Sequence, residues 1–555
     1  MYAGSSAYGR RARYFRHEPV CLVKNSMSKR SPHGKVEHEP PEPRNQNRST
    51  ALPWVILAFG TIVWGIIVCR THFQLEDALI TYRYSANIIA GKGFVFNAGE
   101  RVLGTTTPLV TLFLALVSLP FGSHAVREVA TVVMPIFGLM AGVAAYFALT
   151  KRGISNAAAG LAMFFLYAHI AFIRTGIGGM ETPVLLLLMG LSLWALGSDR
   201  PIMMGVLCGL VVLCRIDGGI WAAMMMLALG LKSWRKAAIS ALVAFLVVVP
   251  WIVFATIYFG SFLPNSMLAK AVVRPGRESI LLSGEHMLRY AHWFVCGTGF
   301  KGILYPLPLW LAILSLGAWR LLRQSPKNLW PVVAFPLVYA FTMYSGRCPK
   351  FEWYLLPITY ICMILLAVGL VEIYRGIQRL IPARARSPVT ACIIVAAVLW
   401  YCGAALPAMI RQMSMVSITE DLVRAKAGKW LRDNTPEHAS AAMEAIGYQG
   451  YYSERRIIDL AGLVTPKVVE FKRSTALNGQ VFDDVLRFLK PDYIVLRSFE
   501  VDTNHHFNGG LLFLTPQKQR QFRETYREVR RFDAPGRGRK ALLCHLTLYQ
   551  RRLPE

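Results

Sequence analysis

The stretch THFQLEDALITYRYSANIIAGKGFVFNAGERVLGTTTP, residues 71–108, follows directly after the first long apolar segment of the chain. It opens with two adjacent carboxylates, Glu76 and Asp77, and continues with apolar residues about one helical turn apart. A glycine-rich turn and a short threonine-rich loop end it. Acidic side chains at the mouth of a membrane span are costly unless they are solvated or used, so we expect this stretch to carry a site.

Composition places the rest of the chain in a membrane. The 555 residues are 54% apolar and 17% charged, and apolar segments recur at roughly the 17 to 25 residues that a spanning helix needs. The net charge of +29 is spread over the N-terminal tail, short loops and the C-terminal third, which favours contact with membrane lipids over nucleic acid. The ten cysteines form no CxxC pair, and a Cys296–Cys348 bridge between outer loops stays open.

The chain divides into three parts. Residues 1–50 are polar and basic and lack the apolar core of a signal peptide, so we expect a disordered cytoplasmic tail. Residues 51–410 are expected to form an all-α polytopic membrane domain, and residues 411–555 a soluble α/β domain. The apolar segments lie near 54–70, 107–121, 127–149, 156–173, 182–197, 201–213, 218–231, 237–258, 303–319, 329–344, 354–374 and 388–410.

Basic loops predict the orientation of these segments. The positive-inside rule places the clusters around residues 151–152, 232–236, 320–327 and 375–386 in the cytoplasm with the N-terminus. This assignment requires one earlier segment not to cross, and 107–121 is the best candidate because it is short and bounded by prolines. We therefore predict about eleven spanning helices, outer-surface loop helices, and a C-terminal domain on the periplasmic side.

The C-terminal part has the pattern of a mixed α/β domain. Glu420–Asn434 is predicted to be an amphipathic helix that ends at Thr435-Pro436, and Ile457–Leu460, Tyr493–Leu496 and Ala541–Tyr549 are predicted to be strands. The part contains no nucleotide-binding fingerprint, and His505-His506 is interpreted as a polar loop rather than a metal site.

Three groups of acids fall on the predicted outer face. A carboxylate at such a position can take a proton from a hydroxyl, and a second acid can orient it or hold a divalent cation. For the Glu76-Asp77 pair and for Glu181 in GGMETP, the alternative is a capping acid in the first turn of a helix. For Asp217, the alternative is a structural pair with neighbouring Arg215 at a helix break.

Two further outer segments carry cations. Asn265 and Lys270 belong to YFGSFLPNSMLAK, where a lysine can bind an anionic headgroup or lie solvated at the membrane surface. The second segment, GRCPKFEWYLLP, contains Arg347, Lys350 and Glu352 beside aromatic residues expected at an interface. The sequence does not choose between Arg347 and Lys350 as an anion ligand.

Six motifs in order resemble bacterial membrane glycosyltransferases of the GT-C class that use polyprenyl-phosphate sugars, similar to the mycobacterial terminal arabinofuranosyltransferase family. They are LEDALITYRYSANIIAGKGFVFNAGERVLGTTTPL, GIGGMETPVLLLL, LCRIDGG, YFGSFLPNSMLAK, KFEWYLLP and WLRDNTP…AIGYQGYYSERRIIDLAGLVTP, spread over residues 71–466. The family's first outer loop usually starts with Asp-Asp, where this chain has Glu76-Asp77. The motifs are specific for the family and not for the sugar.

The resemblance implies an inverting transfer of a sugar, with arabinofuranose as one candidate, from a polyprenyl-phosphate donor to an envelope glycan or glycolipid. Asp77 is the expected general base and Glu76 a supporting catalytic acid. The expected substrate-binding residues are Glu181, Arg215, Asp217, Asn265, Lys270, Arg347 and Glu352. The class leaves the cofactor open between none and a divalent cation, Mg²⁺ or Mn²⁺. The expected location is the bacterial inner membrane.

Two other classes of protein remain as alternatives. A polytopic transporter of envelope precursors also carries acids within the membrane, but it is expected to contain internal repeats or paired broken helices at the midplane. A non-catalytic scaffold that presents the C-terminal domain does not require acids that converge on one face. Whether the acids line one cavity open to the outer leaflet therefore discriminates among the three.

Overall fold

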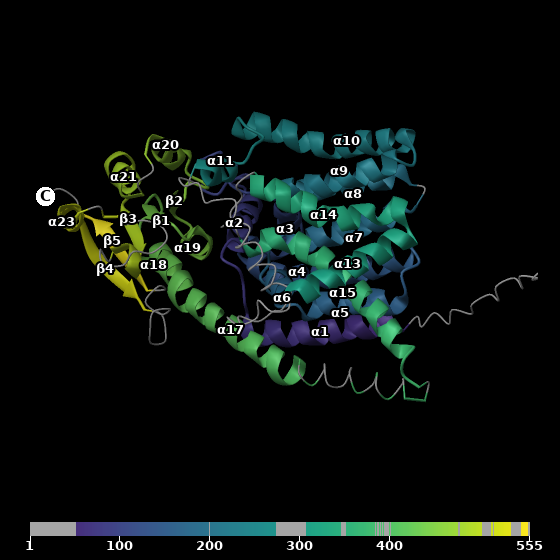
Figure 1. Cartoon of the computed structure of the whole chain (residues 1–555). Helices are drawn as coiled ribbons and strands as arrows, with labels where there is room; N and C mark the ends of the chain where they lie inside the picture. The colour runs from purple at the N-terminus through teal and green to yellow at the C-terminus, as the bar shows by residue number, and fades with distance from the viewer. Residues whose placement is uncertain are drawn as a thin grey trace, which may run out of the picture. The chain divides into compact units, whose positions relative to one another are not determined.

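The fold is taken from a computed structural model that describes residues 51–198, 200–272, 307–345, 351–382, 401–475, 478–501, 512–513, 515–533 and 545–552, with single positions between 384 and 399. A helical domain comes first, and a small sheet with its own helices follows near the C-terminus (Figure 1). The predicted tail, residues 1–50, and the Cys296–Cys348 and His505-His506 interpretations lie outside the described residues.

Helices account for the described part of the predicted membrane domain. Several of them have a proline at their first or second position, which suits the first helical turn because an N–H there would have no partner within the helix. The helices are α1 (Leu52–Thr71), α2 (Ala78–Ile89), α3 (Pro108–Ser118), η1 (Leu119–Phe121), η2 (Ser123–Ala125), α4 (Val126–Thr150), α5 (Asn156–Ala168), α6 (Ile170–Ile177), α7 (Thr182–Leu196), α8 (Pro201–Cys214), η3 (Ile216–Gly218), α9 (Gly219–Gly230), α10 (Trp234–Phe259), α11 (Asn265–Val272), α13 (Leu307–Gln324), α14 (Pro326–Ser345) and α15 (Glu352–Gln378).

Four helical segments in the described residues are long and apolar enough to cross a membrane: α1, Ser123–Thr150, α10 and Trp353–Gln378. Helices α5 and α6 add a fifth if they are one span, and they are bent by 62° at their junction. Segment Pro108–Phe121, predicted not to cross, is one of several shorter apolar helices, and so are Thr182–Leu196 and Pro201–Cys214. Helix length alone therefore does not separate 107–121 from its neighbours, and the count of eleven stays a prediction.

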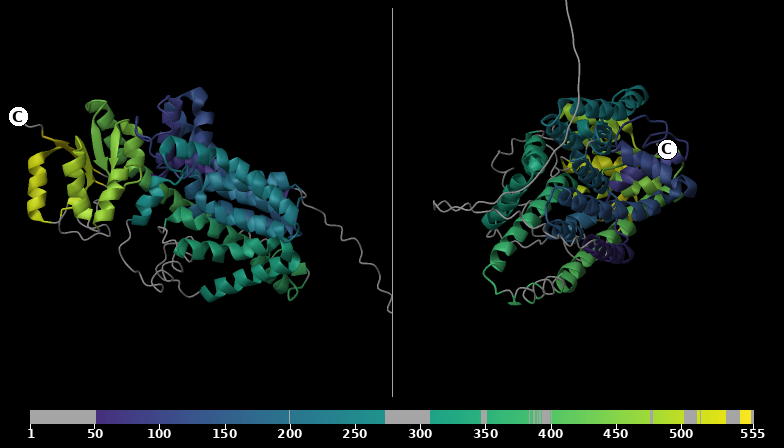
Figure 2. Two further views of the ribbon diagram at one scale, coloured as in Figure 1. Left: turned by 90° about the horizontal axis from the view of Figure 1, so that it is seen from above. Right: turned by 90° about the vertical axis from the view of Figure 1, so that its right-hand side faces the viewer.

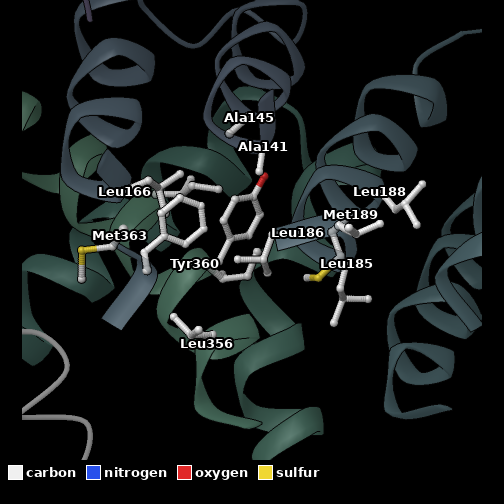
Figure 3. Close-up of a cluster of buried hydrophobic side chains, with 14 of the residues drawn as sticks. Ala141, Ala145, Leu166, Leu185, Leu186, Leu188, Met189, Leu356, Tyr360 and Met363 are labelled. Atoms are coloured by element: carbon white, nitrogen blue, oxygen red, sulfur yellow. The ribbon is translucent and has the colours of Figure 1, made fainter. Parts of the chain in front are cut away.

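Close packing of bulky side chains on small ones joins the helices, which lie alongside one another in the turned views (Figure 2). Trp64 of α1 is buried and donates a 3.0 Å hydrogen bond to the Tyr167 carbonyl. A Cβ atom at Gly138 or Gly176 would lie 2.5 Å from its ring, so both positions require glycine. In Figure 3, Tyr360 of α15 lies among side chains of α4, α5 and α7, namely Ala141, Ala145, Leu166, Leu185, Leu186, Leu188 and Met189.

One long helical segment joins the two domains. It consists of η4 (Tyr401–Ala405), α17 (Leu406–Thr419), η5 (Glu420–Ala425) and α18 (Lys426–Asn434), of which η4 and η5 are π-helical. The predicted helix Glu420–Asn434 corresponds to its last two parts, and the predicted domain boundary at residue 410 falls inside α17. Single-turn π-helical bulges are rare in α-helices and are found often at functional sites.

A five-stranded mixed sheet forms the centre of the C-terminal domain, in the order β2-β1-β3-β5-β4. Strand β1 pairs in parallel with β2 and β3, whereas β5 is antiparallel to β3 and β4. The elements are β1 (Ser440–Met443), α19 (Ile446–Ser453), β2 (Arg456–Asp459), α20 (Pro466–Ser474), α21 (Asn478–Asp484), η6 (Val485–Leu489), β3 (Tyr493–Arg497), α22 (Ser498–Val501), α23 (Pro516–Thr525), β4 (Tyr526–Phe532) and β5 (Leu546–Arg551).

The sequence predicted β2, β3 and the first four residues of β5, and it missed β1 and β4. Strand β1 reads SAAM and is fully buried, but its small residues have little intrinsic preference for a strand. Strand β4 reads YREVRRF and lies at the end of the strand order. Its exposed charges suit an edge strand, where they discourage pairing with another chain, but they resemble a loop in the sequence.

Candidate functional site

The loop with the first acid pair lies against the GGMETP loop. The Leu75 backbone N–H donates a 2.9 Å hydrogen bond to the Gly178 carbonyl. The Tyr82 hydroxyl donates to Gln74 at 2.7 Å and to the Gly179 carbonyl at 3.3 Å. A Cβ atom at Gly179 would lie 1.7 Å from this hydroxyl, and the residue has a φ of +78°, so only glycine fits. Glu181 is thereby brought beside the Glu76-Asp77 pair.

The side chains of Asp77 and Glu181 do not cap the helices that they precede. Asp77 is the N-cap residue of α2 and Glu181 that of α7, yet neither side chain makes a capping hydrogen bond. The alternative explanation for these two acids, stabilisation of a helix start, therefore lacks its main contact. Burial raises the pKa of Glu181, and the nearby charge of Asp77 acts in the same direction, which is further evidence of their proximity.

Arg215 ties the other acids together. Its guanidinium forms a 3.2 Å ion pair with Glu181 and a 2.8 Å ion pair with Asp217, and both arginine and acids are largely buried. It also donates to the Thr182 hydroxyl at 3.2 Å and to the Trp353 carbonyl at 3.1 Å. All three guanidinium nitrogens thus have protein acceptors. The Tyr339 hydroxyl of α14 donates to Asp217. Arg215 and Asp217 of the α8–η3 segment therefore contact the start of α7, α14 and the start of α15.

Lys270 of α11 lies near Asp77. Its ammonium group donates a 3.2 Å hydrogen bond to the Tyr354 hydroxyl, and the Arg215 guanidinium lies 4.9 Å from the Tyr354 ring centroid. Burial raises the pKa of Asp77 and the charge of Lys270 opposes this rise, so the two groups are electrostatic neighbours. Lys270 is therefore one of the described cations near Asp77, together with Arg424.

The C-terminal domain contributes to the same site. The Gly447 backbone N–H donates a 2.6 Å hydrogen bond to Glu76 Oε1. Arg424 of η5 pairs with both oxygens of Glu420, at 2.9 and 3.0 Å, and its charge acts on Glu76 and on Asp77. Arg424 and Gly447 therefore lie next to the acid pair, although both are far from it in the sequence.

Burial raises the pKa of both acids of the pair. Burial raises the pKa of Glu76 to about 8, against the lowering influence of Arg424. Burial also raises the pKa of Asp77, and Lys270 and Arg424 oppose this shift. Two like charges side by side make simultaneous ionisation costly, which pushes the pair toward sharing one proton. A carboxylate with a raised pKa is a better proton acceptor than one in water.

The rest of the 71–108 stretch is anchored on the C-terminal domain. Buried Arg83 donates to the backbone carbonyls of Phe96 at 2.8 Å and Arg455 at 2.6 Å, and also to that of Gly450. Asn97 exchanges hydrogen bonds with the backbone of Ile457 in β2, at 2.8 and 2.9 Å. The loop is thus held between the helical domain and the sheet domain.

The structure brings together six of the nine predicted site residues: Glu76, Asp77, Glu181, Arg215, Asp217 and Lys270. Asn265 has a different environment, because its amide donates to the Gly462 and Leu463 carbonyls of the C-terminal domain at 2.7 and 3.1 Å. Arg347 lies outside the described residues, and of Glu352 the structure describes the backbone, at the start of α15.

Sequence reasoning missed Tyr339, Tyr354, Gly447 and Arg424. Arg424 had a weak signal, its spacing of four residues from Glu420 in a predicted amphipathic helix. Among the described residues, no group of three or more His, Cys, Asp or Glu side chains has the arrangement of a metal site.

Comparison with known proteins gives a local family match and one relative in sequence. A family described as Domain of unknown function (DUF8728) matches residues 411–549. The chain is similar to the terminal beta-(1->2)-arabinofuranosyltransferase of Mycobacterium tuberculosis (strain ATCC 25618 / H37Rv), with 25% identity over 337 residues. The match covers 54% of this chain and 51% of that protein. The chain thus matches about half the length of this curated relative.

Two solved structures resemble the fold over most of the chain. ArnT from Cupriavidus metallidurans, bound to undecaprenyl phosphate, gives a TM-score of 0.56 at 13% identity and covers 90% of this chain and 98% of its own. The oligosaccharyltransferase AglB from Archaeoglobus fulgidus, in complex with an inhibitory peptide and a dolichol-phosphate, gives 0.52 at 14% identity and covers 80% and 69%. The coarser part of the expected fold is confirmed: the chain is mostly helical, has a small C-terminal sheet domain and resembles the fold of GT-C membrane enzymes, whereas the count of about eleven spans stays a prediction.

Proposed function

We propose that this protein is an integral membrane glycosyltransferase that moves a sugar from a polyprenyl-phosphate donor to a cell-envelope glycan or glycolipid. The observation that carries the proposal is the convergence of Asp77, Glu76 and Glu181 with Lys270 at one place, from three separate segments. A scaffold does not require this convergence. The similarity to an arabinofuranosyltransferase and the fold shared with ArnT support the same activity.

Asp77 is the proposed general base. Its carboxylate takes the proton of an acceptor hydroxyl while the acceptor oxygen forms a bond to the anomeric carbon of the donor. The bond between that carbon and the phosphate oxygen breaks, and its electron pair leaves with the polyprenyl phosphate. Attack from the side opposite the leaving group inverts the configuration of the sugar.

Lys270 is the proposed partner of the leaving phosphate. An ammonium group beside a developing phosphate charge stabilises the transition state more than the ground state. Arg215 is less suited to this step, because its three nitrogens already donate to Glu181, Asp217 and backbone or hydroxyl oxygens. We assign it to positioning Glu181 and Asp217, which can then contact acceptor or donor hydroxyls.

Arabinofuranose is the sugar we propose first, because the similar curated protein is named for its transfer. A divalent cation, Mg²⁺ or Mn²⁺, would find oxygen ligands at Glu76 and Asp77, since Arg215 engages the other two acids. It would supply positive charge beside the donor phosphate. We place the site on the periplasmic side of the bacterial inner membrane, with a cytoplasmic N-terminus.

The deciding experiment is sugar transfer by the purified full-length protein, wild type against Asp77→Asn. A panel of radiolabelled polyprenyl-phosphate sugars and a cell-envelope glycan fraction serve as donors and acceptors, with and without EDTA. We expect transfer by the wild type and a loss of roughly 10²- to 10⁴-fold in the variant, because one general base is worth about that much. A fully active Asp77→Asn enzyme refutes the assignment of the base.

The same preparation tests the transporter alternative. Reconstituted vesicles that move a labelled lipid-linked sugar across the bilayer without transferring it would favour a transporter. Full donor binding in Asp77→Asn together with lost transfer favours the enzyme. The lane with EDTA decides whether a metal ion takes part.

A further inference from the structure

A cavity of about 400 Å³ lies at the ends of α7, α8 and α9 that are remote from the acid site. Helix α7 begins beside Glu181 and ends at the cavity, and α8 begins at the cavity and ends beside Arg215. At about 1.5 Å per residue, the 15 residues of α7 separate the two places by roughly 20 Å. The cavity is therefore a second site, distinct from the acid cluster.

Three helices begin at the walls of this cavity. Its lining includes Pro201 in the first turn of α8, Ser233 at the N-cap of α10, and Asn328 in the first turn of α14. The N-cap side chains of α8 and α10 make no capping hydrogen bond. Helix N-termini present free N–H groups and a positive dipole end, which together attract anions.

Four cations share the lining: Arg200, Lys232, Lys236 and Lys327. The described lining contains no carboxylate. Asp199 lies outside the described residues. Burial and then the charge of Arg152 lower the pKa of Lys232, as expected where cations crowd one another.

Behind the cavity, Arg152 adds a further positive charge. Its side chain is 7% exposed and donates to the Ala148 carbonyl at 2.8 Å and to the Leu193 carbonyl, while its Nε has no hydrogen-bond partner. A Cβ atom at Gly197, a lining residue, would lie 3.6 Å from this guanidinium. A buried cation held by neutral carbonyls leaves its charge uncompensated, so an anion at the cavity would be stabilised.

Large apolar side chains flank the cations on the outside of the protein. Ile202, Leu231 and Trp234 are 63%, 70% and 71% exposed, and each is close in sequence to a lining residue. Such exposure is unfavourable in water but expected where acyl chains cover the surface, and tryptophan prefers the headgroup level of a bilayer. The cations of the cavity suit the phosphate headgroup of a phospholipid, and the apolar residues at the rim suit its acyl chains.

We propose that this cavity binds the phosphate headgroup of an anionic membrane lipid. The three helix N-termini and the four cations hold the phosphate oxygens, and the apolar rim contacts the acyl chains. Basic pockets between membrane helices bind anionic lipid headgroups in other proteins. The proposal is independent of sugar transfer, because none of these residues belongs to the acid cluster.

The test measures lipid binding by the full-length protein in detergent, by native mass spectrometry and thermal unfolding. The probes are phosphatidylglycerol, diacylglycerol as its uncharged counterpart, and inorganic phosphate. We expect phosphatidylglycerol to bind and stabilise the wild type, and Lys327→Gln and Arg200→Gln each to weaken binding about fivefold. Both side chains are exposed, so the substitutions leave the core intact.

Arg235→Gln is the matched control. The substitution removes the same charge from the start of α10, and Arg235 does not line the cavity. It should bind phosphatidylglycerol as the wild type does. Equal losses in all three variants, or equal binding of diacylglycerol, overturn the proposal. Binding of inorganic phosphate without the lipid also overturns it, in favour of a soluble anion. Asp77→Asn should retain lipid binding whether or not the protein transfers sugar.

Discussion

The backbone N–H of Gly447 lies 2.6 Å from the Glu76 carboxylate and donates a hydrogen bond to it. A Cβ atom at position 447 would lie 1.9 Å from the Glu76 carbonyl oxygen. The C-terminal domain can therefore approach the acid pair this closely only because residue 447 is glycine. The domain is a wall of the acid site as well as an attachment to the helical domain.

Gly447→Ala should therefore reduce transfer. The added Cβ would lie 1.9 Å from the Glu76 carbonyl oxygen, so the backbone around Glu76 and Asp77 must move by about 1 Å or more to make an ordinary contact. Misplacement on that scale can cost about 10²-fold in rate. The measurement is the initial rate with the donor that the wild type accepts, beside thermal unfolding to confirm folding. Gly65→Ala is the control, because its added Cβ meets nothing within 4 Å; equal rates in both variants would contradict the contact.

Arg424→Gln should shift the pH dependence of transfer. Burial raises the pKa of Glu76 and of Asp77, and the charge of Arg424 opposes this rise. Without that charge, both groups hold their protons to a higher pH. Because the base must be ionised, the acidic limb of the kcat/KM profile is expected to move to higher pH. Arg424→Lys should restore much of the original profile.

Arg432→Gln is the matched control for this shift, because Arg432 lies on α18 and pairs with exposed Asp433. Its profile should coincide with that of the wild type. A loss of activity in Arg424→Gln that is uniform across the pH range would mean that Arg424 has a structural role alone.

Glu76→Gln should change how stability depends on pH. The pKa of Glu76 is about 8 in the folded protein and 4.5 as its reference value, so the folded state binds more protons between these two values. Stability of the wild type therefore falls as pH rises through that window, and the uncharged glutamine removes this contribution. Thermal unfolding across the window should give a shallower decline for the variant, with part of the slope left by Asp77. An unchanged slope would show that Glu76 titrates normally.

Arg83→Met should loosen the contact between the two domains. The buried guanidinium satisfies backbone carbonyls of Phe96, Gly450 and Arg455. Their loss should cost about 3 kcal/mol or more, because hydrogen bonds to charged groups are worth about 1.5–3 kcal/mol each. The measurement is proteolytic cleavage within residues 446–466 under native conditions, which should become faster.

Arg101→Met is the control for the proteolysis experiment. Arg101 is exposed and lies over the Tyr258 ring. Its cleavage rate should match that of the wild type. Unchanged proteolysis in Arg83→Met would indicate that other contacts, such as Asn97 with Ile457, hold the domains together.

Much of the site could be predicted because its chemistry is unusual in its setting. Glu76, Asp77, Glu181 and Asp217 stand out as acids at the ends of apolar segments, where a charge is expensive. The role of Asn265 could not be predicted, because an amide suits a substrate and a backbone carbonyl equally well. The structure gives it the carbonyls of the C-terminal domain.

The sequence by itself determined the helical domain, three of the strands and the identity of the acids, since hydrophobic periodicity and misplaced charges are local properties. The tertiary structure decided which side chains meet. Arg215 forms ion pairs with Glu181 and Asp217, and Lys270 lies near Asp77. Gly447, which is distant in the sequence, donates a hydrogen bond to Glu76. Such pairings depend on how distant segments pack, and no local pattern of residues encodes that packing.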